Sequence, residues 1–318
     1  MIKINRKAVI FGIKKHKLNK KEKIFLKNNK PWGIILFSRN IKNLDQLKKL
    51  VADIKKLFND NKYPIMIDVE GGKVSRLNKI LDLSIFSQSY FGKIYKKDKK
   101  KFITYYKIYV DSVCKILKNA GININSVPVL DVRRKNSHNI IGNRSYSKNA
   151  SEVSLIGNIC VDLYHKNKIA TVIKHIPGHG LSKVDSHFKT PTINKKKDEL
   201  LKKDFKPFIN SKSNIAMTAH VIYKEYDPIN TATHSKIIIK KVIRNYIKFK
   251  GLLISDDISM KSLKYNIIKN TLIALKAGCN LILHCNGNIN EMKKIAKIIP
   301  NIDRFTQKKT SDLYNFLR

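Results

Sequence analysis

The chain has 318 residues and is 42% hydrophobic, which is enough to bury a sizeable core and fits a globular protein. No apolar run approaches the roughly 18 residues of a membrane span, so no membrane partner is expected. The net charge of +42 suggests nucleic-acid binding, but only nine of the 65 basic residues are arginine and lysines occur in nearly every polar stretch, which favours composition bias over a specific nucleic-acid site.

The N-terminus and the cysteines indicate a cytoplasmic protein. A short apolar run over residues 8–13 follows the charged N-terminus, but it lacks a small-residue cleavage site, so we do not expect a secretory signal. Cys114, Cys160, Cys279 and Cys285 lack CxxC spacing and lie in or beside predicted helices and strands. We therefore expect reduced packing residues rather than a disulfide framework or a zinc ribbon. A monomer is expected.

Along the chain, short apolar runs typical of buried strands alternate with stretches of helical periodicity. The strand-like runs cover residues 8–12, 33–37, 64–69, 126–130, 171–174, 215–220, 251–255 and 280–284. The helical stretches cover residues 44–58, 102–119, 151–166, 197–209, 236–248 and 267–277. Alternation of this kind predicts parallel strands, and nearly continuous apolar strands predict burial on both faces of the sheet.

Eight strand units over about 300 residues predict a single-domain (β/α)8 TIM-type barrel. A doubly wound open sheet is the alternative, but no GxGxxG sequence follows the first strand. The barrel core is expected over about residues 8–300, followed by a short basic C-terminal tail. The longest insertion, residues 78–101, is expected to be a loop beside the barrel mouth.

Polar residues stand at the ends of most predicted strands. They are Asp68 and Glu70, Asp131, Lys174 and His175, His220, and Ser255, Asp256 and Asp257. Any one of them could cap a helix or bind a loop. Together they indicate an active site, because catalytic residues of this fold gather at the carboxyl ends of the strands.

The segment from Ile173 to Pro191 is the richest in candidate chemistry. It holds three histidines and an aspartate, and Pro177, Gly178 and Gly180 interrupt regular structure. These polar groups are therefore expected on a loop at a strand end, where histidine and aspartate can transfer protons or bind ligands.

Six segments together resemble the successive motifs of family 3 glycoside hydrolases, in particular the single-domain bacterial β-N-acetylhexosaminidases. They are IDVEGGKVSRL (67–77), NIIGNRSYS (139–147), KHIPGHGLSKVDSHFKTP (174–191), MTAHVIY (217–223), GLLISDDISM (251–260) and AGCNLIL (277–283). The resemblance implies a barrel that removes terminal, nonreducing β-linked N-acetylglucosamine from peptidoglycan fragments, with retention of configuration and without a cofactor.

Retaining hydrolysis needs a carboxylate nucleophile and a group that first protonates the leaving oxygen and then activates water. By the resemblance, Asp256 is the nucleophile and His187 is the general acid/base. Asp185 is implied to orient the His187 imidazole and to support its cationic form. Asp257 matches no chemical role, so a structural role is expected for it.

The resemblance also assigns the sugar-binding positions, which are Asp68, Arg76, Arg144, Lys174 and His175. Charged partners orient the hydroxyls of a neutral polyol strongly. Two of the nine arginines fall here, as a need for fork geometry predicts.

The roles of two further histidines stay open. His179 is expected to brace its loop rather than contact substrate, and no role is assigned to His220.

The sequence departs from the family pattern at two positions, and the first departure, which removes an amide near the expected sugar pocket, puts fine specificity in question. Val69 replaces a usual glutamine and Lys73 occupies an arginine-like position.

Two other functions remain alternatives. One is a metal-dependent barrel hydrolase with His175, His179, Asp185, His187 and Asp256 as ligands, although the first strand offers none. The other is a vestigial sugar-binding protein.

Overall fold

The computed structural model describes residues 5–134, 141–182, 184 and 189–318. The strands are β1 (Lys7–Gly12), β2 (Pro31–Leu36), β3 (Ile65–Ile67), β4 (Val69–Gly71), β5 (Val74–Ser75), β6 (Ile124–Asn125), β7 (Ala170–Thr171), β8 (Ile173–Ile176), β9 (Thr192–Ile193), β10 (Ile215–Thr218), β11 (Ile222–Tyr223), β12 (Leu252–Asp257) and β13 (Leu281–His284). The α-helices are α1 (Lys20–Asn29), α2 (Leu44–Phe58), α3 (Gln88–Lys97), α4 (Lys99–Ala120), α5 (Ala150–Lys166), α6 (Lys197–Glu199), α7 (Ile267–Ala277), α8 (Ile289–Ile298) and α9 (Arg304–Phe316).

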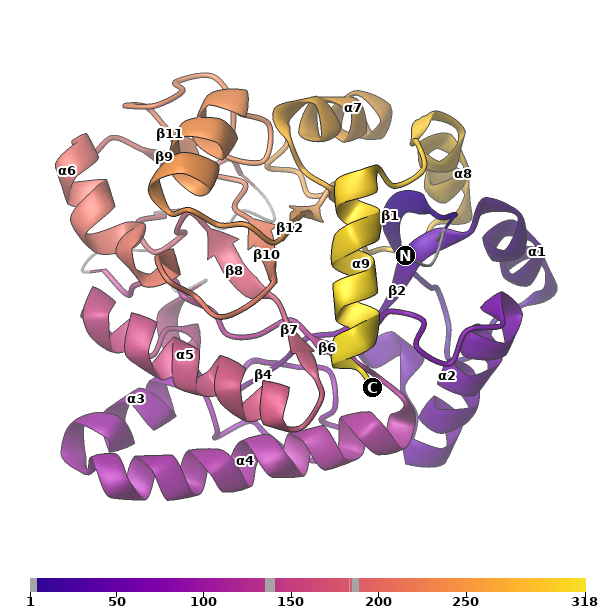
Figure 1. The fold of residues 1–318 in the computed structure, drawn as a ribbon, viewed down its shortest axis with the longest axis horizontal. Coiled ribbons are helices and arrows are strands. Elements are labelled where there is room, and N and C mark those ends of the chain that lie inside the picture. Colours follow the sequence, from indigo (N-terminus) through magenta and orange to yellow (C-terminus); the bar gives the residue numbers. More distant parts are fainter. Residues whose placement is uncertain (1–4, 135–140, 183, 185–188) are drawn as a thin grey trace.

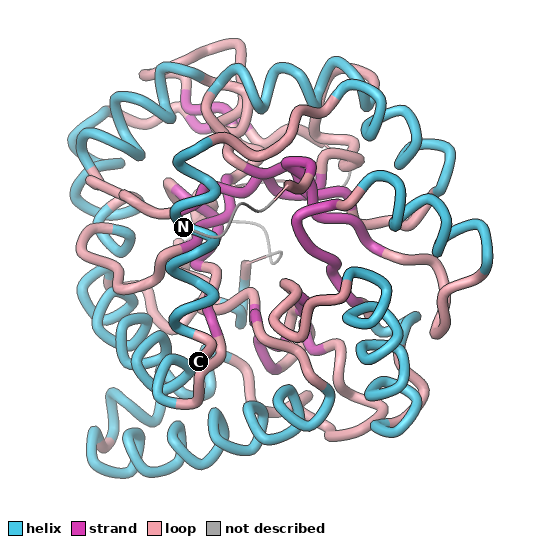
Figure 2. The backbone as a smooth tube through the Cα atoms, turned by 45° about the vertical axis from the view of Figure 1, so that its right-hand side comes forward, coloured by secondary structure: helices cyan, strands magenta, loops and turns pink. Residues whose placement is uncertain are grey.

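Nine strands form a parallel barrel with the order β7-β6-β3-β2-β1-β13-β12-β10-β8. The two ends of this order, β7 and β8, are parts of one chain segment that is interrupted only at Val172, so the sheet closes on itself with eight strand positions. Helices surround the strands (Figures 1 and 2). The predicted (β/α)8 barrel is therefore confirmed. None of the helices in the described ranges is long and apolar enough to cross a bilayer.

Several predicted helices are confirmed closely because their caps coincide with the periodic pattern. Helices α2 and α7 have the predicted bounds, and α5 and α4 differ from prediction by only a few residues. The Asn43 side chain accepts a hydrogen bond from the Gln46 N–H at the start of α2, and Asn59 ends this helix in the left-handed conformation.

Two predicted helices have a different hydrogen-bonding pattern. The 197–209 stretch consists of α6, a π-helix over Leu200–Asp204 and a 3-10 turn over Lys206–Phe208. The 236–248 stretch is mainly a π-helix over Ile238–Tyr246. Apolar periodicity identifies a buried helical face, but it does not distinguish these tighter and wider turns from an α-helix.

The predicted fourth strand, residues 126–130, is misplaced. The strand at this barrel position is β6, two residues earlier, and a single bridge between Val129 and Lys174 follows it. Pro128 has no N–H to donate and therefore cannot continue the hydrogen-bonding ladder.

The insertion over residues 78–101 is not only a loop, because it contains helix α3. The Ser87 hydroxyl accepts the Tyr90 N–H at the start of α3. Phe91 of α3 packs against Tyr106 and Tyr109 of α4, with ring centroids 4.6 and 4.9 Å apart. Polar and basic residues alternate with the aromatic residues in the sequence of α3, so its helical periodicity was not recognised.

The prediction that a short basic tail follows the core is also wrong. Residues 304–316 form helix α9 across the N-terminal end of the barrel (Figure 1). Leu313 and Tyr314 of this helix are buried, so the core extends beyond residue 300. Arg6, just before β1, donates to the Tyr314 hydroxyl over 2.8 Å. Trp32 of β2 donates its indole N–H to the Thr310 hydroxyl over 2.8 Å.

Replacing Thr310 with valine should lower the free energy of unfolding by about 1–3 kcal/mol, because the buried Trp32 N–H would lose its acceptor. Thr104→Val is the matched control, since the hydroxyls of Thr104 and Thr310 both donate to the carbonyl four residues earlier in their helices, but Thr104 is exposed. The control should change stability by less than about 0.5 kcal/mol. Equal losses in urea unfolding would contradict this role for Thr310.

Candidate active site

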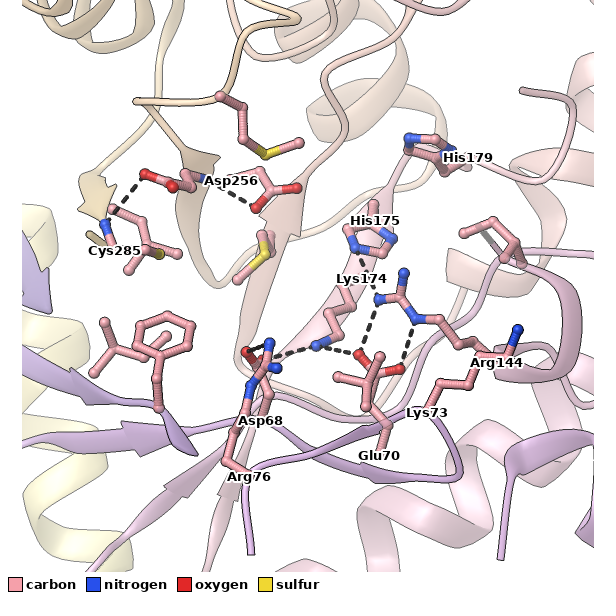
Figure 3. A pocket seen from close by; sticks show the side chains of 18 of the residues that line it. Asp68, Glu70, Lys73, Arg76, Arg144, Lys174, His175, His179, Asp256 and Cys285 are labelled. Carbon is pink, nitrogen blue, oxygen red and sulfur yellow. Dashed lines mark hydrogen bonds and ion pairs between the residues drawn. The ribbon is translucent and has the colours of Figure 1, made fainter. Parts of the chain in front are cut away.

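A cavity of about 420 Å³ opens at the carboxyl ends of the barrel strands (Figure 3). Its lining comes from segments far apart in the sequence: Ile35, Phe37, Asp68, Glu70, Lys73, Val74, Arg76, Ile141, Asn143, Arg144, Lys174, His175, His179, Met217, Asp256, Asp257, Met260, Leu283 and Cys285. The opposite end of the barrel carries α9. The site thus lies at the end of the barrel that the polar strand ends predicted.

The hairpin of β4 and β5 follows β3 directly and carries part of the cavity floor. Gly71 and Gly72 form its turn with φ values of 84° and 61°, which favour glycine. The Arg76 N–H donates to the Asp68 carbonyl over 3.1 Å, so the hairpin returns beside the end of β3. This return places the side chains of Asp68 and Arg76 next to each other.

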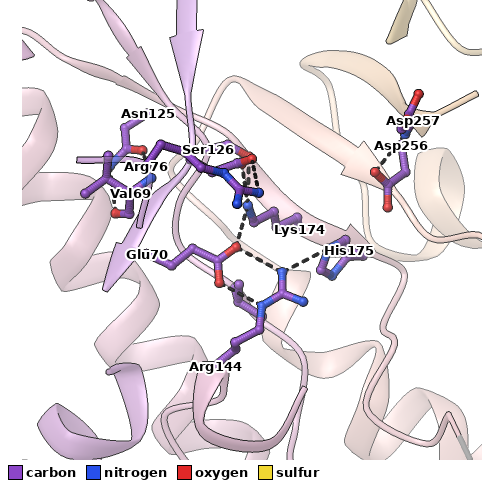
Figure 4. Close-up of polar contacts among 12 residues, drawn as sticks. Val69, Glu70, Arg76, Asn125, Ser126, Arg144, Lys174, His175, Asp256 and Asp257 are labelled. Atoms are coloured by element: carbon purple, nitrogen blue, oxygen red, sulfur yellow. Dashed lines mark hydrogen bonds and ion pairs between the residues drawn. The ribbon is translucent and has the colours of Figure 1, made fainter. Parts of the chain in front are cut away.

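A buried ion network forms the floor of the cavity (Figure 4). The Lys174 ammonium contacts Asp68 at 2.9 Å, Glu70 at 2.6 Å and the Ser126 hydroxyl at 3.0 Å. Arg144 donates two parallel hydrogen bonds to Glu70, at 2.8 and 2.9 Å. Each charge in this network therefore has an opposite partner, as burial requires.

The network also determines the ionisation of its members. Burial alone would raise the pKa of Glu70, but Arg144 and Lys174 outweigh it and hold that pKa below its ordinary value. Burial likewise opposes the charged form of Lys174, yet Asp68 and Glu70 raise its pKa. Lys174 is thus a permanent cation at neutral pH.

A second cluster lies beside this network. The Asp131 carboxylate accepts the His175 ring Nδ1–H at 2.7 Å and the His179 backbone N–H at 2.6 Å. His175 Nε2 lies 3.5 Å from the Arg144 guanidinium. The two clusters are thereby joined through His175.

Asp256 lies at the end of β12, across the cavity from the ion network (Figures 3 and 4). One of its carboxylate oxygens accepts the Asp257 N–H over 2.7 Å. Asp257 in turn accepts the backbone N–H groups of Ser259 and Cys285, both at 3.1 Å. These local bonds agree with the structural role expected for Asp257.

His220 braces the same strand end. Its Nε2 lies 3.0 Å from the Asp257 carbonyl and its Nδ1 lies 2.7 Å from the Thr233 hydroxyl. A carbonyl oxygen only accepts hydrogen bonds, so Nε2 carries the proton. The histidine whose role the sequence left open therefore fixes the position of the β12 terminus, which carries Asp256.

Six of the residues predicted from the sequence line one cavity: Asp68, Arg76, Arg144, Lys174, His175 and Asp256. Asp185 and His187 lie outside the described residues. Sequence reasoning did not assign a role to Glu70 or Asp131, although both stand at polar strand ends. Their partners come from other segments, so only the polar strand-end pattern could have pointed to them.

The two departures from the family pattern differ in their consequences. Lys73 lines the cavity. Val69 belongs to the buried core, and both its backbone N–H and its carbonyl bond the Asn125 side chain, at 2.9 and 3.1 Å. Val69 is not among the residues that line the cavity, so its side chain does not contact a sugar bound there.

The four cysteines are free, and Cys114, Cys160 and Cys279 are buried. In the part of the chain that the structure describes, no three His, Cys, Asp or Glu side chains are grouped to hold a metal ion. Two of the ligands in the metal-dependent alternative, Asp185 and His187, fall outside that part.

Comparison with known proteins gives consistent matches over most of the chain. Residues 3–312 match the family model described as Glycosyl hydrolase family 3 N terminal domain. A β-hexosaminidase of Neisseria gonorrhoeae is 34% identical over 289 residues, which cover 89% of this chain and 79% of that protein. A β-hexosaminidase of Idiomarina loihiensis is 30% identical over 272 residues, which cover 84% of this chain and 80% of that protein.

The fold agrees with these matches. The crystal structure of NagZ from Neisseria gonorrhoeae in complex with N-trifluoroacetyl-D-glucosamine superposes with a TM-score of 0.87. It is 29% identical, and the match covers 99% of this chain and 91% of that one.

The stability of the protein should fall as the pH drops from about 6.5 to 4, because burial lowers the pKa of His179 from 6.5 to about 4. The unfolded chain binds a proton in this window and the folded site does not, so stability is full above pH 6.5 and declines below it, by up to about 3 kcal/mol. In urea titrations at several pH values, the slope of the unfolding free energy against pH reports how many protons unfolding takes up. For His179→Gln this number should be smaller by about one between pH 4 and 6.5. Identical slopes for the variant and the wild type would contradict a neutral, buried His179.

Proposed function

The chain belongs to glycosyl hydrolase family 3 and is a glycosidase of the β-hexosaminidase type, and we propose that it removes terminal β-linked N-acetylglucosamine with retention of configuration. The observation that carries this proposal is the position of Asp256 across a cavity from the network of Asp68, Lys174 and Arg144. The cavity, about 420 Å³, is of a size to hold a sugar. The neisserial NagZ, bound to N-trifluoroacetyl-D-glucosamine, offers further support.

In the proposed reaction, an Asp256 carboxylate oxygen attacks the anomeric carbon while the glycosidic bond breaks. His187 gives its proton to the leaving oxygen, and Asp185 orients and supports the cationic imidazole. His187 then takes a proton from water, and the hydroxide oxygen displaces Asp256 from the anomeric carbon. The sugar is released with its original configuration, and both catalytic groups return to their starting protonation.

The floor of the cavity suits a neutral sugar with several hydroxyl groups. The guanidinium groups of Arg76 and Arg144 and the ammonium of Lys174 donate hydrogen bonds, whereas the Asp68 carboxylate accepts them. Because these groups are already held by ion pairs with one another or with Glu70, sugar binding requires little further ordering of side chains. We therefore propose Asp68, Arg76, Arg144, Lys174 and His175 as the sugar-binding residues.

We propose that the natural substrates are fragments of peptidoglycan that carry terminal N-acetylglucosamine, processed in the cytoplasm during cell-wall recycling. Four free cysteines are consistent with a reducing compartment. We further propose a monomer without a specific nucleic-acid partner, since lysines are spread through nearly every polar stretch. Hydrolysis of N-acetylglucosaminyl-1,6-anhydro-N-acetylmuramic acid, compared with a chitin disaccharide, tests the substrate assignment.

Asp256→Ala should lower the rate of 4-nitrophenyl N-acetyl-β-D-glucosaminide hydrolysis by at least about 10³-fold, because no glycosyl-enzyme can form. The variant should remain folded and still bind N-acetylglucosamine. Asp257→Asn is the matched neighbour and should lose less activity, since its amide oxygen can still accept the Ser259 and Cys285 N–H groups. Activity of Asp256→Ala near the wild-type level would rule out the nucleophile assignment.

His187→Ala should impair natural disaccharides far more than nitrophenyl glycosides, because nitrophenolate leaves without needing a proton. Asp185→Ala should shift the ratio in the same direction but less far, since a poorly oriented imidazole can still donate. The measurement is kcat/KM for both substrates in each variant. A uniform loss across the two leaving groups would indicate a binding role instead of acid catalysis.

A further inference from the structure

Asp131 occupies an unusual position for a buried carboxylate. It is 0% exposed, and its charge is held by N–H donors from the segment that follows β8 and from β8 itself. Oδ1 accepts the backbone N–H groups of His175 at 3.3 Å and His179 at 2.6 Å. Oδ2 accepts from His175 Nδ1 at 2.7 Å. Oδ1 therefore holds the backbone of the loop, and Oδ2 faces the His175 imidazole.

The other nitrogen of this imidazole is constrained from the opposite side. His175 Nε2 lies 3.5 Å from Arg144 Nη2, and guanidinium nitrogens only donate hydrogen bonds. Arg144 cannot turn away easily, because two hydrogen bonds of 2.8 and 2.9 Å hold it to the buried Glu70. Nε2 thus faces a fixed donor, which disfavours a proton on it, while the length of this contact, 3.5 Å, leaves the Nε2 lone pair available for a shorter hydrogen bond from a sugar hydroxyl.

Both constraints select the same form of the ring. A carboxylate beside Nδ1 requires a proton there, and a guanidinium beside Nε2 disfavours one. Burial alone would raise the pKa of Asp131, but His175 and the N–H donors outweigh burial and keep that pKa below its ordinary value, so Asp131 is the ionised acceptor that this geometry requires.

We propose that Asp131 is a positioning residue that holds His175 as the neutral, Nδ1-protonated tautomer and so presents Nε2 to the cavity as a hydrogen-bond acceptor for a sugar hydroxyl. The catalytic consequence of this inference rests on the proposed hexosaminidase function, whereas the tautomer does not. In both close-ups His175 lies between the Arg144 guanidinium and Asp256 (Figures 3 and 4).

The acceptor has a specific use in this cavity. Lys174 and Arg144 can only donate to the sugar, and the nearby Glu70 carboxylate is occupied by both of them. A neutral His175 therefore adds an acceptor without adding another negative charge beside the nucleophile. The Nε2-protonated tautomer would instead present one more hydrogen-bond donor to the sugar. The proton of the sugar hydroxyl at this position would then have no acceptor on the ring.

Asp131→Asn tests this proposal with little structural change. The amide oxygen can keep both backbone bonds to His175 and His179, because these converge on one oxygen in the wild type. The amide NH₂ would replace Oδ2 and donate to Nδ1, which reverses the tautomer. The variant thus separates the ring-facing function of Asp131 from its function in holding the loop.

The primary measurement is ¹⁵N NMR of histidine-labelled protein, with the His175 signal identified by comparison with His175→Gln. We expect a protonated Nδ1 and a bare Nε2 in the wild type, and the reverse pattern in Asp131→Asn. The variant should also lose at least about tenfold in kcat/KM, through a higher KM, and bind N-acetylglucosamine more weakly. A protonated Nε2 in the wild type, or an unchanged tautomer in the variant, overturns the proposal.

Asp227→Asn is the matched control. Asp227 is a buried aspartate that accepts backbone N–H bonds from Ile229 and Asn230, and within the described part of the chain it forms no hydrogen bond with an imidazole. It should leave the His175 spectrum and KM unchanged, and a shift equal to that of Asp131→Asn would overturn the assignment. A wild type that shows the expected tautomer but does not hydrolyse hexosaminides would instead refute the proposed function, so the two failures are distinguishable.

Discussion

The site depends on the sharing of one buried carboxylate, Glu70, between two cations, Lys174 and Arg144. Removing three charges from water is costly, and the attraction among them offsets that cost only when the geometry is good. Such an arrangement is weak evidence for high stability, since apolar residues could fill the same volume. Its value is that the donors are already aligned before a sugar arrives, so little reorganisation accompanies binding.

Barrel closure supplies this alignment. Lys174 and Asp68 are 106 residues apart in the sequence but 2.9 Å apart in the structure, because β3 and β8 end at the same face. The fold and the site are also linked directly. The Asn125 side chain at the end of β6 bonds the backbone of Val69, which holds the hairpin that carries Glu70. A shift of the hairpin would therefore disturb barrel and ion network together.

How much the sequence could predict follows from the range of each interaction. The alternation of strands and helices and the polar strand ends are local patterns, so the barrel and the positions of Asp68, Lys174, His175 and Asp256 were predictable, and each of these residues lines the cavity. Helix α9 was missed because its contacts with Arg6 and Trp32 join the two ends of the chain. Asp131 was recognised as a strand-end acid, but its function depends on a partner 44 residues away. No local pattern shows which partner a buried carboxylate selects.

The distribution of arginine bears on the meaning of the high positive charge. Lysine supplies most of the positive charge, yet five of the nine arginines each bind two or more separate groups or atoms through their forked guanidinium: Arg6, Arg39, Arg134, Arg144 and Arg244. A lysine ammonium is a single point of donation and cannot span such groups in one plane. On an exposed surface this difference matters little, because both side chains are solvated. Arginine thus occurs mainly where planar, multiple donation holds the fold or the cavity floor. This pattern is expected when a composition bias replaces arginine with lysine except where the guanidinium geometry is needed. The positive charge of the surface therefore has a different origin from the positive charge in the cavity floor.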